Sequence, residues 1–218
     1  MADNQDLFWG ETDLKNDRVH TAEGSLPLER REETIAVRGS KKGLTLFTFG
    51  FAGGRLIQAH DGRALFLRWP ALDSPLGDIT LAGLARCDNW QSFRNGVRRL
   101  HNSPMMVGYA DAGGNIGLQT TGLFPRRSSP LGSLLRSLDD PSATWRGYLD
   151  FDELPSTYNP PEGYVIHANQ YSEAMFAHGP HLTNRWHAPS RALRIEERLM
   201  EIKAHTPETL AEIQDDLL

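Results

Sequence analysis

Leu44-Thr-Leu-Phe-Thr-Phe49 is the middle one of three runs that decide the fold; its neighbours are Thr34-Ile-Ala-Val37 and Ala64-Leu-Phe-Leu-Arg-Trp69. All three are short and rich in β-branched or aromatic residues, which is typical of strands. The segments between them carry turn signals, Gly39-Ser-Lys-Lys-Gly43 and Asp61-Gly62. The pattern predicts an antiparallel meander.

Residues on either side of the meander carry weaker or different signals. Residues 1–32 are polar and turn-rich, but the Asp6-Leu-Phe-Trp9 patch could pin one extended piece onto the core. After the meander, a helix is predicted from a cap at Asp88 or Asn89 to a stop at Pro104, because apolar residues recur at steps of three and four: Trp90, Phe93, Val97 and Leu100.

A second hairpin and two further helices are predicted beyond residue 104. The runs 105–109 and 116–120 flank a loop whose glycines tolerate a tight turn. One apolar helical face is formed by Ala192, Ile195, Leu199 and Ile202. Thr206-Pro207 then reads as a helix cap followed by proline in the first turn.

These elements predict an α+β fold of antiparallel sheets with packed helices. We expect a strand-rich core with a helical insert over residues 1–125, and an irregular connection over 126–162 that includes a short helical candidate at 131–138. Residues 163–218 are expected to hold a strand exit and the C-terminal helices.

Composition limits the function classes. The chain has 218 residues, 39% of them hydrophobic, and a net charge of −5 with its basic residues scattered, which disfavours nucleic acid as a partner. No run of 18 apolar residues occurs, so we expect a soluble chain without a membrane partner. The single cysteine, Cys87, cannot form an internal disulfide and reads as a small apolar residue rather than a nucleophile.

The stretch Gly163-Tyr-Val-Ile-His-Ala-Asn-Gln170 carries the candidate chemistry. Asn169 follows apolar residues that read as a buried strand, and its side-chain amide could donate to a developing oxyanion. The alternative is that Asn169 bonds its own loop backbone. Arg191 falls in the first turn of a predicted helix, where the helix dipole disfavours a cation, so it either serves a site or extends into water.

Neither a metal centre nor a nucleophile is apparent from the residues. Four histidines crowd one region without any zinc-ligand spacing, and they read as loop or core residues: His167, His178, His181 and His187. The serine elbow Gly-x-Ser-x-Gly is missing, and the Gly-Ser bonds at 24–25, 39–40 and 132–133 lie in polar turns. Removal of Met1 would expose Ala2, which cannot attack a carbonyl.

Several motifs, in order, resemble the middle of the large (β) chain of the penicillin acylases, or penicillin amidases. They are Arg31-Glu-Glu-Thr-Ile35, Tyr109-Ala-Asp-x-x-Gly-Asn-Ile-Gly117, Thr121-Gly-Leu-Phe-Pro-Arg126, Trp145-Arg-Gly-Tyr-Leu-Asp-Phe-Asp-Glu-Leu-Pro155, Asn159-Pro-Pro-x-Gly-Tyr164 with Ala168-Asn169, and the closing 213–215. The resemblance runs from about Asp3 to the last residue.

The resemblance implies an N-terminal-nucleophile amidohydrolase with an αββα fold. Such enzymes cleave the side-chain amide of β-lactam antibiotics or related N-acyl compounds, including acyl-homoserine lactones. A serine at the start of the β chain attacks, and its own α-amino group takes the proton. By resemblance, Asn169 matches the asparagine that stabilises the oxyanion, and Arg191 matches the arginine that orients it.

The resemblance also implies bound calcium. The family's ligands match Asp3 and Asp6 through their side chains and Gln5 through its backbone, and oxygen ligands of this kind suit calcium. Glu173 is only a loose match to a later ligand aspartate.

Several features of the family have no match in these 218 residues. The catalytic serine, the first central strands and the small α chain have no counterpart, so we expect part of an acylase that is inactive alone. The alternative is a non-catalytic module that binds a small acyl ligand or a partner chain. Export to the periplasm is an expectation for the parent family, and the acyl preference is left open.

Overall fold

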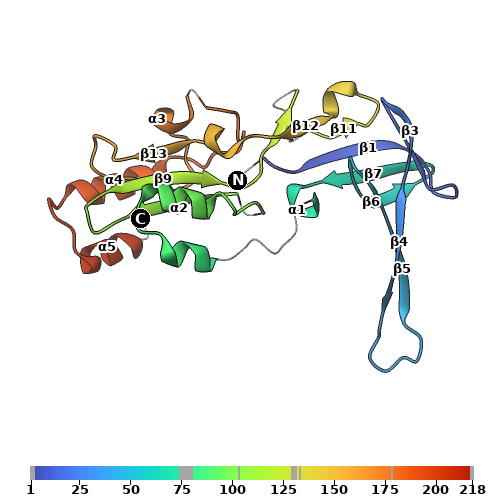
Figure 1. The fold of residues 1–218 in the computed structure, drawn as a ribbon, viewed down its shortest axis with the longest axis horizontal. Helices are drawn as coiled ribbons and strands as arrows, with labels where there is room; N and C mark the ends of the chain where they lie inside the picture. The colour runs from blue at the N-terminus through green and yellow to red at the C-terminus, as the bar shows by residue number, and fades with distance from the viewer. Residues whose placement is uncertain are drawn as a thin grey trace. The chain divides into compact units, whose positions relative to one another are not determined.

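The computed structural model describes residues 3–73, 81–102, 104–128, 132, 134–177 and 179–216. Figure 1 shows the order of the elements along the chain. Two compact units are present, and each is built from separated stretches. The first, called the β-sheet unit, contains the described residues of 3–73 and 123–149; the second, called the helical unit, contains those of 81–122 and 150–216.

The β-sheet unit is one large sheet in the order β3-β2-β1-β7-β6-β5-β4, with β11 added beside β1. Its strands are β1 (Asp6–Asp13), β2 (Arg18–Thr21), β3 (Gly24–Pro27), β4 (Glu29–Ile35), β5 (Leu44–Phe51), β6 (Gly54–His60) and β7 (Arg63–Arg68). Phe8 on β1 and Phe66 on β7 are paired across the two strands, and both are buried in one apolar cluster. The expected pinning of residues 6–9 onto the core is therefore confirmed.

The antiparallel meander is also confirmed, because β4, β5, β6 and β7 pair in sequence order. The Asp61-Gly62 turn has φ of 48° and 75°, the two positive angles of the tight turn that suits twisted strands. Two details differ from the prediction. The first strand begins at Glu29 and ends at Ile35, and β6 was not anticipated because its apolar residues are few.

The stretch 126–162 is more ordered than predicted. It contributes β10 (Pro125–Arg127), β11 (Arg136–Ser137), β12 (Trp145–Tyr148) and β13 (Ser156–Tyr158), with 3₁₀ turns at Pro141–Ala143 and Phe151–Glu153. The helical candidate is wrong where the structure describes it, because residues 136–137 pair in parallel with β1 and Leu138 packs against the Phe8 cluster. Residues 131 and 133 lie outside the described part of the chain.

The helical unit contains the predicted hairpin, β8 (Met105–Ala110) with β9 (Ile116–Thr121), and β13 joins β9 as a third strand. Helix α2 (Trp90–Val97) begins at Asn89, whose side chain accepts from the Ser92 N–H in a capping box. The helix ends before Pro104, and Leu100 lies in the following turn, where it still packs with Phe93 and Val97.

The remaining helices are α1 (Pro70–Asp73), a 3₁₀ helix at Leu81–Arg86, α3 (Glu173–Phe176), α4 (Ser190–Met200) and α5 (Pro207–Gln214). Thr206 caps α5 as predicted, and Pro207 is its first residue. Helix α4 begins one residue earlier than a cap at Ser190 would give, because Pro189 is the cap and Ser190 is already the first helical residue. In the described part of the chain, no helix is both long and apolar enough to cross a membrane.

The expected α+β class of antiparallel sheets with packed helices is confirmed, with the β1–β11 pair as a parallel exception.

Candidate active site

Residues 164–167, before Asn169, form no strand, so the predicted strand exit there is wrong. Gly163 has φ of 78°, and its N–H donates to the Pro160 carbonyl at 3.0 Å, which makes a tight turn. The backbone is then held by a side chain rather than by a neighbouring strand, since the Ala168 N–H donates to Gln170 Oε1 at 2.6 Å. Residue 170 forms only an isolated bridge with His187.

Asn169 itself adopts a left-handed backbone conformation with φ of 65°. Asparagine is among the few non-glycine residues that favour this region. Its carbonyl accepts from the His187 N–H at 2.8 Å, and the preceding Ala168 is buried, whereas the Asn169 side chain is exposed. The backbone at Asn169 is therefore fixed on both sides while its amide faces outward.

Arg191 reaches Asn169 from the first turn of α4. Its Nη2 donates to Asn169 Oδ1 at 2.9 Å and to the Ala168 carbonyl at 2.5 Å. The structure therefore brings together the two residues that the sequence singled out, and the Asn169 side chain bonds Arg191 rather than its own loop backbone.

This contact fixes which end of the amide faces Arg191. A guanidinium has donors only, so the amide oxygen must face it, and the amide nitrogen must point elsewhere. Among the described residues, the Asn169 Nδ2 donors have no hydrogen-bond partner. The result is a preoriented donor on an exposed corner, which is the arrangement that stabilises an oxyanion.

His167 lies two positions before Asn169 and is half-buried. Burial lowers its pKa, and the positive charge of Arg191 lowers it further. Both causes favour the neutral imidazole beside this corner.

The predicted calcium ligands Asp3 and Asp6 lie in the β-sheet unit, where their carboxylates bind Arg127. Arg127 Nε donates to Asp6 Oδ2 at 2.8 Å and Nη2 donates to Asp6 Oδ1 at 2.9 Å and to Asp3 Oδ1 at 3.3 Å. Trp145 Nε1 also donates to Asp6, and Gln5 is exposed. No group of three His, Cys, Asp or Glu side chains able to hold a metal occurs among the described residues.

As they stand, these two carboxylates do not make a calcium site, because calcium takes six to eight oxygens and a guanidinium already neutralises much of their charge. Glu173 is the first residue of α3, in the other unit. Calcium stays a prediction of the resemblance.

The histidine cluster is only partly described. His181 and His187 are exposed, and His178 lies outside the described residues. Cys87 is half-buried against the α2 cluster, and its thiol donates to the Ser92 carbonyl at 3.3 Å.

In the helical unit, a cavity of about 320 Å³ is lined by Gln170 and Ala192, the chain neighbours of the candidate pair, and by Tyr164 and Glu196. Tyr164 donates to the Glu196 carboxylate, and that hydrogen bond raises the pKa of the tyrosine.

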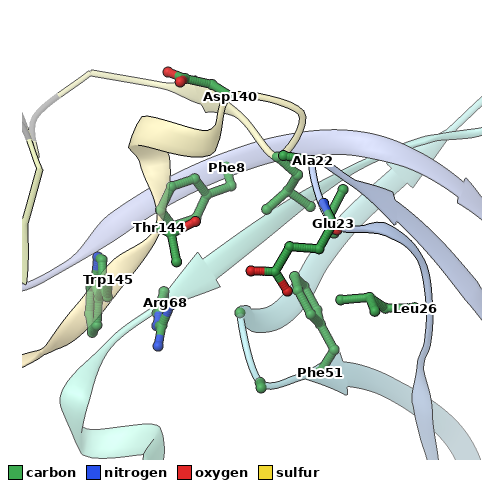
Figure 2. A pocket seen from close by; sticks show the side chains of 13 residues that line it. Phe8, Ala22, Glu23, Leu26, Phe51, Arg68, Asp140, Thr144 and Trp145 are labelled. Atoms are coloured by element: carbon green, nitrogen blue, oxygen red, sulfur yellow. The ribbon is translucent and has the colours of Figure 1, made fainter.

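The second cavity, of about 220 Å³, lies in the β-sheet unit. Figure 2 shows Arg68 beside Trp145 at one end of it, with the Glu23 side chain reaching toward Phe51. The Arg68 guanidinium carbon lies 4.4 Å from the Trp145 ring centroid. None of the predicted site residues lines this cavity.

Sequence reasoning missed two residues that matter here. Gln170 holds the turn that presents Asn169, and its only signal was its position directly after the asparagine. Arg127 has no local signal in the sequence, because its carboxylate partners lie more than 120 positions away.

All residues, 1–218, match the family model described as penicillin amidase. The acyl-homoserine lactone acylase QuiP of Pseudomonas aeruginosa is 28% identical over 99% of this chain and 27% of its own length. The penicillin G acylase of Escherichia coli is 33% identical over 79% of this chain and 20% of its own.

A similar fold occurs in the solved structure of a thermostable penicillin G acylase from Alcaligenes faecalis. The TM-score is 0.77 at 21% identity, over 97% of this chain and 38% of that one. The chain spans about a quarter of the length of the curated relatives it matches.

Proposed function

Because the chain belongs to the penicillin amidase family, we propose that it is part of an amidohydrolase that cleaves linear amides of N-acyl compounds, with Asn169 as an oxyanion donor. The observation that carries this proposal is the bond from Arg191 to Asn169 Oδ1, which leaves the amide donors directed outward.

The role of Asn169 follows from the chemistry of acyl transfer. When a nucleophile attacks the amide carbon, the carbonyl electrons move to oxygen, and donors aimed at that oxygen lower the barrier. Asn169 Nδ2–H is such a donor, and Arg191 acts as a positioning residue that keeps the amide from rotating. The nucleophile comes from a segment other than these 218 residues, so the chain alone is inactive.

The substrate class follows from the relatives, which are named for acyl-homoserine lactones and for penicillin G. Both contain an acyl group joined through a linear amide to a ring-bearing amine. We propose an N-acyl amide of this type as the substrate.

A chimera tests the proposal. This chain replaces the matching segment of the Pseudomonas aeruginosa relative, and release of homoserine lactone from an N-acyl-homoserine lactone is measured. We expect hydrolysis by the chimera and none by the 218-residue chain alone. Hydrolysis by the purified chain alone, at the rate of the chimera, would contradict the proposal that the nucleophile comes from another segment.

A further inference from the structure

The hairpin of β4 and β5 has no core of its own. Every residue of β4 is exposed, as are the residues of β5 from Leu44 to Thr48. Figure 1 shows this hairpin extending away from the rest of the β-sheet unit. We call residues 29–48 the arm. A two-stranded ribbon that is open on both sides is at best marginally stable in water.

One face of the arm is apolar toward its tip. The register pairs Ile35 with Leu44 and Glu33 with Leu46, and directly opposite residues of an antiparallel pair share a face. Ile35, Leu44 and Leu46 are 49%, 51% and 42% exposed. The opposite face is different, since Thr34 pairs with Thr45, and Arg30 covers the Phe47 ring at 4.1 Å.

The charged part of the arm's outer edge, Glu29 to Glu33, disfavours pairing with a second copy of the chain. An antiparallel pair of β4 strands related by a two-fold axis places one residue opposite its own copy. The first five residues of β4, from Glu29 to Glu33, are all charged, so a register centred on any of them sets like charges face to face. Pairing with a second copy is therefore disfavoured in the registers centred on these five residues.

We infer that the apolar face of the arm, Ile35 with Leu44 and Leu46, docks a strand from the remaining penicillin amidase polypeptide. This inference rests on the proposed function, because curated relatives are about four times as long as the segment matched here. The partner strand carries apolar side chains where it meets these three residues. Docking gives the arm the burial that it lacks within its own unit.

The test uses binding rather than catalysis. The probe is the Pseudomonas aeruginosa relative with its matching segment deleted, mixed with the full 218-residue chain. We expect a complex in which hydrogen exchange of the β4 and β5 amides slows. Leu44→Glu, whose new charge lies opposite the uncharged Ile35, should weaken the affinity by about tenfold or more, as expected for loss of a buried apolar anchor.

The matched control is Thr45→Glu, which adds the same charge one residue away on the opposite face. It should leave the affinity within about twofold, because rim charges contribute little. Both residues are exposed, so neither change removes a buried contact within the chain.

Three results would overturn the inference. Equal loss of affinity with Leu44→Glu and Thr45→Glu would show that the apolar face is not selective. Absence of a complex would show that the remaining polypeptide is not the partner. Association of the chain with itself, or with vesicles of anionic lipid, that is lost on Leu44→Glu would assign the face to another occupant. A complex without hydrolysis would reject the proposed function and leave the docking intact.

Discussion

Arg127 in the β-sheet unit and Arg191 in the helical unit each hold a polar side chain that the sequence had marked as functional. Arg127 is 7% exposed and bonds through all three of its nitrogens to Asp6 and Asp3. Arg191 is exposed. Among the described residues it donates only from Nη2, to Asn169 Oδ1 and to the Ala168 carbonyl. Arg127 occupies the carboxylates that it bonds, whereas Arg191 bonds only the amide oxygen of Asn169 and leaves its amide donors available.

The difference teaches how to separate two uses of the same residue. A buried guanidinium that satisfies buried carboxylates is part of the structure, because removing it leaves charges without compensation. An exposed guanidinium that fixes one end of an amide creates a donor for something outside the chain. Burial and the number of bonded nitrogens, rather than residue type, distinguish the two.

The largest effect on stability is expected when the Arg127 guanidinium is removed. Arg127→Met leaves the Asp6 carboxylate, whose side chain is 4% exposed, without its charged partner. We expect a loss of about 3–5 kcal/mol in the free energy of unfolding, as for other broken buried pairs. Urea unfolding followed by circular dichroism measures it.

The control is Arg31→Met, because Arg31 forms an exposed pair with Glu33 at 3.8 Å. It should change the free energy of unfolding by no more than about 0.5 kcal/mol. Equal effects of the two substitutions would contradict the structural role of Arg127.

A smaller effect is expected at Arg191, where catalysis rather than folding should change. Arg191→Ala in the chimera removes a charged hydrogen bond to Asn169 Oδ1, worth about 1.5–3 kcal/mol. We expect kcat to fall by roughly 10- to 100-fold. Arg191→Lys should recover part of the rate, and an unchanged kcat with alanine would reject the positioning role.

Two asparagines in and before α2 allow a similar comparison of stability. Asn89 caps the helix by accepting from the Ser92 N–H at 2.9 Å, whereas Asn95 is an exposed residue inside the helix. Asn89→Ala should cost about 1 kcal/mol of stability. Asn95→Ala should cost nothing or stabilise slightly, because alanine is the better helix former. Similar losses of stability for the two substitutions would contradict the capping role of Asn89.

The smallest expected effect is a pH dependence at His167. Its folded pKa is lowered by burial, so the unfolded chain binds the proton more readily. Stability should therefore fall as the pH drops below about 6.5, the ordinary histidine value. His167→Gln should flatten the pH profile of the unfolding midpoint in that range, and a parallel profile would show that other groups dominate.

Local signals predicted much of the fold. The Asp61-Gly62 turn, the Asn89 cap and the Thr206-Pro207 start were readable because each depends on neighbouring residues. The family resemblance was confirmed, because residues 1–218 match the penicillin amidase family model.

Long-range pairing could not be predicted in the same way. Strand β11 is two residues long and exists only because it pairs with β1, far away in sequence. The strand expected before Asn169 does not form. The backbone there bonds the Gln170 side chain rather than a partner strand. The pairing of Asn169 with Arg191 was predicted by resemblance, whereas the Arg127 cluster left no local signal.

The most direct test of the central claim is kcat of Asn169→Ala in the chimera, measured beside Asn95→Ala on an N-acyl-homoserine lactone. If the outward amide stabilises the oxyanion, kcat for Asn169→Ala falls by about 10²–10³-fold. KM should change little, because that contact strengthens only in the transition state. The Asn95→Ala control should keep its rate. A kcat for Asn169→Ala within about twofold of the parent chimera would contradict the account.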